Sequence, residues 1–371
     1  MTKPKPPVGI ITLYGEYNYG NRLQNYALSQ ALLSLGFAPE TIVFRSRRAV
    51  FMAWVKRFVK RALSLLRLRP LSPLDQSIPK RSAQVAPFTK KYIPTLYANR
   101  HTFDTKKYAA FIVGSDQVWN PHYVGRDDDY FLAFAPESKR VAYAASFGVS
   151  SLPSETKNFY REHIASISHL SVREQDGARL IQKLDPKLQP QVVPDPTMLL
   201  ARKDWQALAD QTSLPADLTR GKYILVYTLE GLSKSMEAEL KKHAKSHGYR
   251  IQTIIGNKPS KDHLIPDVPG FLSLIAHADL VVTDSFHACV FSIIFQTPFT
   301  VFEREDGAKM FSRIKTLLDK FGLRAAIFGP QRGFSKTITK SDFSRVNQQL
   351  KVWSSVGYAF LRSALNVADK P

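Results

Sequence analysis

The feature that most constrains the fold is an alternation of short apolar strands with amphipathic helices, which occurs in both halves of the chain. The predicted strands of the first half are 8–13, 41–44, 108–113, 141–145, 169–172 and 192–193. Those of the second half are 223–228, 250–255, 280–282 and 299–302. Repeated strand–helix units form parallel sheets, and 371 residues exceed one ordinary core. The pattern therefore predicts an α/β protein with two parallel-sheet domains facing each other across a cleft.

The domain boundaries follow from where this alternation stops and restarts. Residues 1–200 are expected to form the first domain and residues 222–341 the second, joined by a polar linker at 201–221. Residues 342–371 contain a helix able to pack back on the first domain. The proline-rich stretch 70–87 predicts a loop before a short helix at 87–92, because proline disfavours helix interiors.

Composition excludes several classes of protein. Cys289 is the only cysteine, which rules out a disulfide framework and cysteine-rich metal sites. No segment approaches the roughly 18 consecutive apolar residues of a transmembrane helix. The first 20 residues lack the apolar core and the cleavage site of a secretory signal, so we expect a cytoplasmic protein.

Positive charge is concentrated in one segment. The net charge is +21, and residues 45–69 hold nine Lys or Arg and no acidic residue. Within this segment apolar side chains recur at helical spacing, opposite a face that carries Lys56, Arg57, Lys60 and Arg61. A basic amphipathic helix of this kind suits an anionic membrane surface, so we expect peripheral membrane binding; the alternative is packing on its own domain. Because no nucleic-acid-binding signature accompanies the charge, we expect no nucleic-acid partner.

The most informative stretch for function is 280–297, in which a buried strand leads into an apolar helix. Thr283, Asp284 and Ser285 lie between the two and are all residues that cap helix starts. His287 therefore falls in the first helical turn, beside free N–H groups and the positive end of the helix dipole. This arrangement predicts an anion site with a titratable group beside it. The alternative is a buried helix with one imidazole near the surface.

Three further positions lie where strands of the first half end. The loop 14–21 joins the first strand to a helix, and its Gly20 permits close approach of a ligand while Asn21 can cap the helix. It matches neither a GxGxxG nor a Walker pattern, so a structural turn is the alternative. Asp116 and Arg173 each follow a strand at the edge where open α/β sheets bind ligands. The alternatives are a helix-capping role for Asp116 and a surface ion pair for Arg173.

Six short blocks of sequence, taken together, resemble the polysaccharide pyruvyltransferase family. They are 18–28, 111–121, 143–148, 170–181, 193–200 and 283–299. The resemblance implies a GT-B-like fold with two Rossmann-like domains and the active site between them. It also implies transfer of a pyruvyl group from phosphoenolpyruvate to two hydroxyls of a sugar, giving a ketal in surface polysaccharide biosynthesis. The acceptor would be a sugar or a lipid-linked oligosaccharide.

This chain departs from the family pattern at one position. The family usually has an arginine two residues before the histidine, whereas this chain has Ser285 in the form TDSFH. Arg304 or Arg313, which follow the motif, are candidates to supply the missing cation.

The resemblance also suggests roles for the remaining candidates. His287 would be the general acid, Arg173 a clamp on carboxylate or phosphate, and Asp116 a base or orienter for an acceptor hydroxyl. The residues expected to bind substrate are Asn18, Gly20, Asn21, Ser115, Asp284, Ser285, Arg304 and Arg313. No metal-ligand motif occurs, so no cofactor is expected besides the donor substrate.

Two alternative functions remain compatible with the sequence. A GT-B glycosyltransferase would use the same cleft and helix starts to bind the diphosphate of a nucleotide sugar. A non-catalytic assembly protein would dock on the membrane through residues 45–69 and would not depend on His287.

Overall fold

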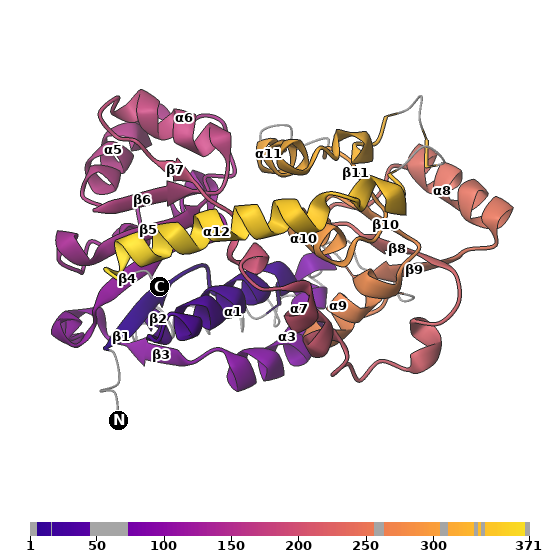
Figure 1. The fold of residues 1–371 in the computed structure, drawn as a ribbon, viewed down its shortest axis with the longest axis horizontal. Helices are drawn as coiled ribbons and strands as arrows, with labels where there is room; N and C mark the ends of the chain where they lie inside the picture. Colours follow the sequence, from indigo (N-terminus) through magenta and orange to yellow (C-terminus); the bar gives the residue numbers. More distant parts are fainter. Residues whose placement is uncertain are drawn as a thin grey trace, which may run out of the picture.

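Two parallel sheets organise the chain (Figure 1). We describe a computed structural model, in which residues 6–15, 17–44, 73–255, 263–304, 311–329, 333–334 and 338–367 are described. The basic segment 45–69 lies outside the described residues. Every strand pairing within the two sheets is parallel, as the alternation of strands and helices predicts.

The first sheet has seven strands in the order β3-β2-β1-β4-β5-β6-β7. The strands are β1 (Pro7–Ile11), β2 (Ala38–Phe44), β3 (Thr95–Ala98), β4 (Ala110–Val113), β5 (Arg140–Ala145), β6 (His169–Val172) and β7 (Gln191–Val192). Successive residues of β4 contribute to two different apolar clusters, because side chains alternate between the faces of a strand. One cluster includes α5 (Lys157–Ala165) and α6 (Gln175–Leu184), and the other includes α1 (Tyr19–Ser34) and α12 (Val346–Ala364).

The second sheet has four strands in the order β11-β10-β8-β9. The strands are β8 (Tyr223–Tyr227), β9 (Arg250–Ile254), β10 (Leu280–Thr283) and β11 (Phe299–Val301). Apolar side chains of α8 (Lys234–His247) pack on one face, and those of α9 (Val268–His277) and α10 (Phe286–Phe295) pack on the other. The helix α11 (Ser312–Phe321) follows β11 and packs against α10.

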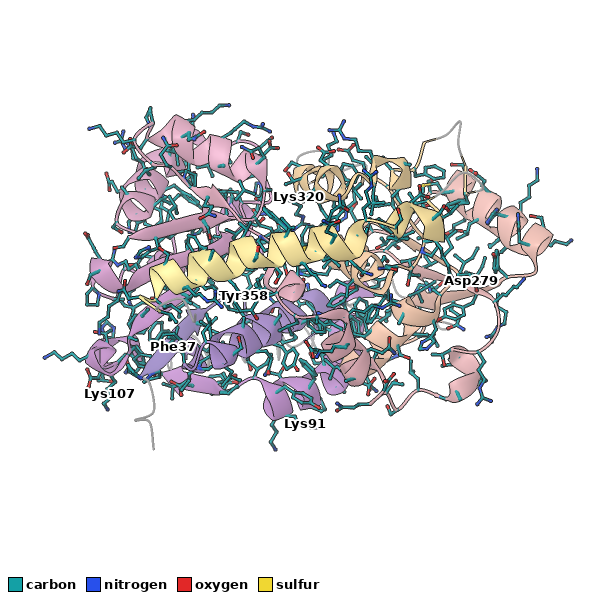
Figure 2. All side chains as sticks on the ribbon, viewed as in Figure 1. Phe37, Lys91, Lys107, Asp279, Lys320 and Tyr358 are labelled. Atoms are coloured by element: carbon teal, nitrogen blue, oxygen red, sulfur yellow. The ribbon has the colours of Figure 1, made fainter. Side chains whose placement is uncertain are left out.

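The two halves share one apolar core. The cluster around α9 and α10 also includes residues of α1 and of α7 (Arg202–Ala209), so it joins helices of the first half to the second sheet. Tyr19 of α1 stacks on Phe271 of α9 with ring centroids 4.6 Å apart and an interplanar angle of 4°. The long helix α12 runs across both halves (Figure 1): Val346 belongs to the shared core, and Leu361 packs on the first sheet. Lys320 of α11 places its Nζ 4.0 Å from the ring centroid of Trp353 on α12 (Figure 2).

The prediction of a loop at 70–87 followed by a short helix at 87–92 is wrong. One helix, α3 (Pro73–Tyr92), covers this stretch with Pro79 and Pro87 inside it. Ser77, Arg81, Val85 and Phe88 recur at helical spacing and are buried, whereas both prolines are exposed. The packing of that buried stripe outweighs the cost of about 3 kcal/mol that a proline imposes on a helix interior.

Candidate functional site

A cleft of about 600 Å³ lies where the carboxyl ends of both sheets meet, and we call it the central cleft. It is lined by residues from both halves of the chain, among them Asn18, Asn21, Arg81, Asp116, Ser285, Phe286, His287, Arg304 and Arg313. These residues follow β1, β4, β10 and β11 or lie on α3 and α11. The carboxyl edge of parallel strands is the usual ligand-binding edge of open α/β sheets, and here two such edges contribute to one cleft.

His287 lies at a junction of two helix starts. It occupies the first turn of α10, and only 8% of its surface is exposed. The α1 residue Gly20 packs directly on its ring, because a Cβ added at Gly20 would lie 2.2 Å from Nδ1 of His287. Among the described residues, Nε2 of His287 has no hydrogen-bond partner; it is buried and lies 3.6 Å from Oδ2 of Asp195. The imidazole is thus held between the start of α1 on one side and Asp195 on the other.

The two helix starts differ in how they are capped. At α1, Oδ1 of Asn18 accepts a hydrogen bond of 3.1 Å from the N–H of Asn21, so the cap is Asn18 and the capping role expected for Asn21 is wrong. At α10, the side chain of Ser285 makes no capping bond. The start of α10 therefore keeps first-turn N–H groups without a side-chain cap beside the central cleft, and such groups bind anions.

Asp116 is held as a buried carboxylate. It accepts a hydrogen bond of 3.2 Å from Nδ2 of Asn21 and lies 3.7 Å from Nη2 of Arg173. Its φ of 68° is left-handed, a conformation that Asp tolerates and that concentrates at functional sites. Burial alone would raise the pKa of Asp116, but nearby positive charges, above all Arg173 and His287, hold it below its ordinary value. A depressed pKa makes Asp116 a weak base and favours a role in orienting a hydroxyl.

Asp195 connects the two candidate catalytic cations. Its Oδ2 lies 2.7 Å from Nη1 of Arg173, and Oδ1 accepts bonds from the N–H and the hydroxyl of Thr197. Burial would raise the pKa of Asp195, but the charges of His287 and Arg173 hold it well below its ordinary value. The Asp195 carboxylate therefore positions both cations.

Arg173 does not line the central cleft. Its side chain is 1% exposed, and its guanidinium lies behind Asp116 and over the ring of Phe286, with Cζ 4.3 Å from the ring centroid. Within the described part of the chain, Nε and Nη2 of Arg173 have no hydrogen-bond acceptor. Its role as a clamp on carboxylate or phosphate stays a prediction. Asp116 and Phe286 lie between its guanidinium and the central cleft, so one of them would have to move before Arg173 could contact a ligand there.

Arg304 and Arg313 line the central cleft but differ in charge pairing. Nε of Arg304 lies 3.0 Å from Oδ2 of Asp284. Arg313 is buried and forms no ion pair with any described residue, and its Nε has no hydrogen-bond acceptor. Burial first, and the charge of Arg173 second, lower the pKa of Arg313 to about 10. Arg313 is therefore the better candidate for the missing cation.

Two expected ligand residues lie behind the wall of the central cleft. Ser115 is fully buried, and its hydroxyl lies 3.1 Å from two acceptors, Oδ2 of Asp195 and the carbonyl of Ala144. Asp284 accepts hydrogen bonds from the N–H groups of Leu229 and Glu230 as well as from Arg304, so its carboxylate is fully occupied. The substrate-binding role of both stays a prediction, since each side chain already has hydrogen-bond partners within the protein.

Two residues that matter here were missed as site residues. Asp195 lies in the motif VPDP just after β7, and its position after a strand was the available signal. Arg81 was not recognised as a cleft residue because its segment was predicted to be a loop. Among the described residues, the one group of three potential metal ligands is Asp127–Asp129, and Arg100 pairs with Asp128 and Asp129. None of these aspartates lines the central cleft.

Comparison with known proteins identifies a family and a fold. The model of the family described as polysaccharide pyruvyl transferase matches residues 18–306. No curated protein matches the sequence. Among solved structures, a UDP complex of MnaA from S. aureus is similar at a TM-score of 0.50 and 13% identity, covering 99% of both chains. The UDP-GlcNAc 2-epimerase of Neisseria meningitidis has a TM-score of 0.46 and 11% identity, covering 97% of this chain and 94% of that chain. The likeness shows the fold alone, which is GT-B-like.

Proposed function

The chain belongs to the polysaccharide pyruvyl transferase family, and from this premise we propose that it transfers a pyruvyl group from phosphoenolpyruvate to two hydroxyls of a sugar. The observation that carries the proposal is Arg313, a buried guanidinium that forms no ion pair with any described residue and that lines the same cleft as His287 and the uncapped start of α10. Phosphoenolpyruvate carries a carboxylate and a phosphate, and both suit a guanidinium and helix N–H groups.

The reaction replaces one C–O bond to phosphate by two C–O bonds to sugar. His287 protonates the methylene carbon, which leaves an oxocarbenium-like centre at the carbon that bears the phosphate. One sugar hydroxyl attacks that carbon, the bond to phosphate breaks, and the second hydroxyl closes the ketal. Of the two hydroxyl protons, one ends on the new methyl group and the other on phosphate. No redox step is involved.

Each named residue has one role in this scheme. Asp116 accepts a hydrogen bond from the attacking hydroxyl and orients it, as its depressed pKa favours. Arg313 offsets the charge that accumulates on the departing phosphate. Asp195 holds His287 in place, since its Oδ2 lies 3.6 Å from Nε2 of the imidazole.

A binding experiment tests the donor directly. We expect phosphoenolpyruvate to raise the melting temperature of the wild type, since a ligand that binds the folded state stabilises it. The melting temperature of Arg313→Met should not change when phosphoenolpyruvate is added. Arg179→Met is the matched control, because Arg179 is an exposed arginine paired with Asp176. Stabilisation by a nucleotide sugar and not by phosphoenolpyruvate would identify a glycosyltransferase instead. Transfer itself is measured as phosphate release together with a sugar product heavier by pyruvate minus water.

We also propose that residues 45–69 hold the enzyme at an anionic membrane, where a lipid-linked acceptor would be found. No helix within the described ranges has both the length and the apolarity needed to cross a bilayer. We expect salt-sensitive sedimentation with vesicles that contain phosphatidylglycerol. The sedimentation should be lost when Lys56, Arg57, Lys60 and Arg61 become Gln, and undiminished sedimentation would refute docking through this face.

A further inference from the structure

A second unpaired guanidinium, that of Arg81, lies in the wall of the central cleft. Arg81 is on α3, in the buried stripe that faces the rest of the protein, and only 1% of its surface is exposed. Its neighbour Lys80 on the same helix is exposed. Arg81 therefore faces inward because of its place on the helix, at the junction of the two halves.

The described residues offer Arg81 no counter-charge. Its Nε and Nη1 have no hydrogen-bond acceptor, and it forms no ion pair with any described residue. Its one specific contact is with the ring of Tyr17, whose centroid is 5.5 Å from Cζ. Arg22, another buried arginine, has acceptors by contrast: its Nε donates to Oδ1 of Asn21 at 3.1 Å and its Nη2 to the carbonyl of Leu13 at 2.8 Å. An unpaired buried charge is costly, so its presence beside a cleft points to a ligand that supplies the missing anion.

The other charges of the central cleft leave two guanidinium groups unmatched. Arg304 is paired with Asp284. The carboxylate of Asp116 lies 3.7 Å from Nη2 of Arg173, so it is not available to Arg81 alone. Arg81 and Arg313 remain, the first from the first half of the chain and the second from the second half. Two unmatched cations in one cleft fit one ligand with two anionic groups.

We propose that Arg81 binds one of the two anionic groups of the donor, while Arg313 binds the other. The proposal rests on the proposed function for the identity of the donor. A planar guanidinium pairs with a carboxylate or a phosphate through two parallel hydrogen bonds, which fixes the orientation of the group as well as its place. A donor held in this way would bridge the two halves of the molecule. Arg81 would thus set the specificity for a dianionic three-carbon donor over a neutral one.

Calorimetric titration of the full chain tests this assignment. We expect Arg81→Met to weaken binding of phosphoenolpyruvate by about 10- to 100-fold, the usual effect of losing a hydrogen-bonded charge pair. Lys80→Met is the matched control and should bind like the wild type, because Lys80 is exposed on the same helix. Arg81→Lys keeps the positive charge but loses the planar guanidinium, so its affinity for phosphoenolpyruvate should lie between those of Arg81→Met and the wild type. Unfolding of each unliganded variant shows whether the fold is kept, and we expect no loss of stability in Arg81→Met.

Separate titrations with inorganic phosphate and with pyruvate identify the group that Arg81 binds. Loss of the phosphate response in Arg81→Met assigns the phosphate, and loss of the pyruvate response assigns the carboxylate. Unchanged affinity of Arg81→Met for all three ligands overturns the proposal and leaves the proposed function standing. If UDP-GlcNAc binds in place of phosphoenolpyruvate and its binding depends on Arg81, the donor is wrong while the anion-binding role of Arg81 stands. Should none of these anions bind the wild type, both proposals fail.

Discussion

At the scale of single residues, the site depends on close contact between groups from opposite halves of the chain. Gly20 begins a helix of the first half, and His287 begins a helix of the second. They touch without intervening side-chain atoms because Gly20 has none. Asp195 then links His287 to Arg173, so the imidazole is positioned from both sides. Small changes at these contacts should alter the chemistry while leaving the cores intact.

Gly20→Ala should reduce activity sharply without unfolding the protein. The new methyl group would lie 2.2 Å from Nδ1 of His287, so the ring must move away from its place at the cleft. We expect kcat to fall by at least about 100-fold, which is the usual effect of misplacing a general acid. Gly177→Ala in α6 is the matched control, since its added Cβ meets only ordinary contacts of 3.4 Å and longer. Equal activities of the two variants would contradict the proposed role of His287.

Arg313→Met should stabilise the unliganded protein. The pKa of Arg313 is lowered to about 10 by burial and by Arg173, so at neutral pH its charge is less favourable in the folded state than in the unfolded state. Removing that charge should raise the free energy of unfolding by about 1–3 kcal/mol, measured by urea unfolding. The same variant should lose stabilisation by phosphoenolpyruvate. A loss of stability on this substitution would mean that Arg313 has a structural partner.

At the scale of elements, helices outside the sheets carry the candidate cationic side chains that line the central cleft. The α10 start brings His287, α3 brings Arg81 and α11 brings Arg313. The helix α12 contributes no residue to the central cleft, yet it packs on the cores of both halves and so fixes their relation. The two ends of α12 pack in different places: Val346 lies in the shared core, and Phe360 and Leu361 pack on the first sheet.

Leu361→Ala should destabilise the whole protein through α12. Leu361 is fully buried, and truncating such a side chain costs about 2–5 kcal/mol through lost burial and the cavity left behind. Val352→Ala on the same helix is the control, since Val352 is 56% exposed and its truncation should change stability by less than about 0.5 kcal/mol. Urea midpoints for both variants measure the difference. Similar midpoints would show that α12 does not hold the halves together.

At the scale of the whole molecule, positive charge is divided between surface and cleft. Many basic side chains point into solvent, such as Lys91 and Lys107 (Figure 2). Arg81 and Arg313 are buried where the two sheets meet. The surface charges favour anionic partners in general, whereas the buried pair would select a small anionic ligand by its geometry. Folding of both halves onto each other brings the two buried guanidinium groups to one cleft.

The buried carboxylates should make the fold sensitive to acid. The pKa values of Asp116 and Asp195 are depressed in the folded state by neighbouring cations, although burial alone would raise them. Their contribution to stability is therefore complete above the unfolded value of about 3.9 and is lost as the pH falls toward the folded values. We expect the melting temperature to fall progressively as the pH drops below about 4. Asp195→Asn should flatten this slope, and an unaltered slope would show that Asp195 is not the group responsible.

The sequence by itself determined the fold class and most of the strands. Apolar runs such as 280–282 and the caps that follow them are local features, so the parallel sheets and the start of α10 could be predicted without coordinates. It also predicted His287, Asp116 and Arg313 as cleft residues, because each lies in or just after a motif that follows a strand. The strand β3 and the full length of α3 were missed, since short strands and proline-containing helices are stabilised by distant packing.

Only the tertiary structure decided which of the candidate side chains share a space. It distinguished Arg313 from Arg304, because Arg304 forms an ion pair with Asp284. It placed Arg173 behind Asp116 and brought Asp195 between Arg173 and His287. These outcomes depend on contacts between residues far apart in the chain. Charge pairing and burial are properties of such contacts, and no local pattern encodes them.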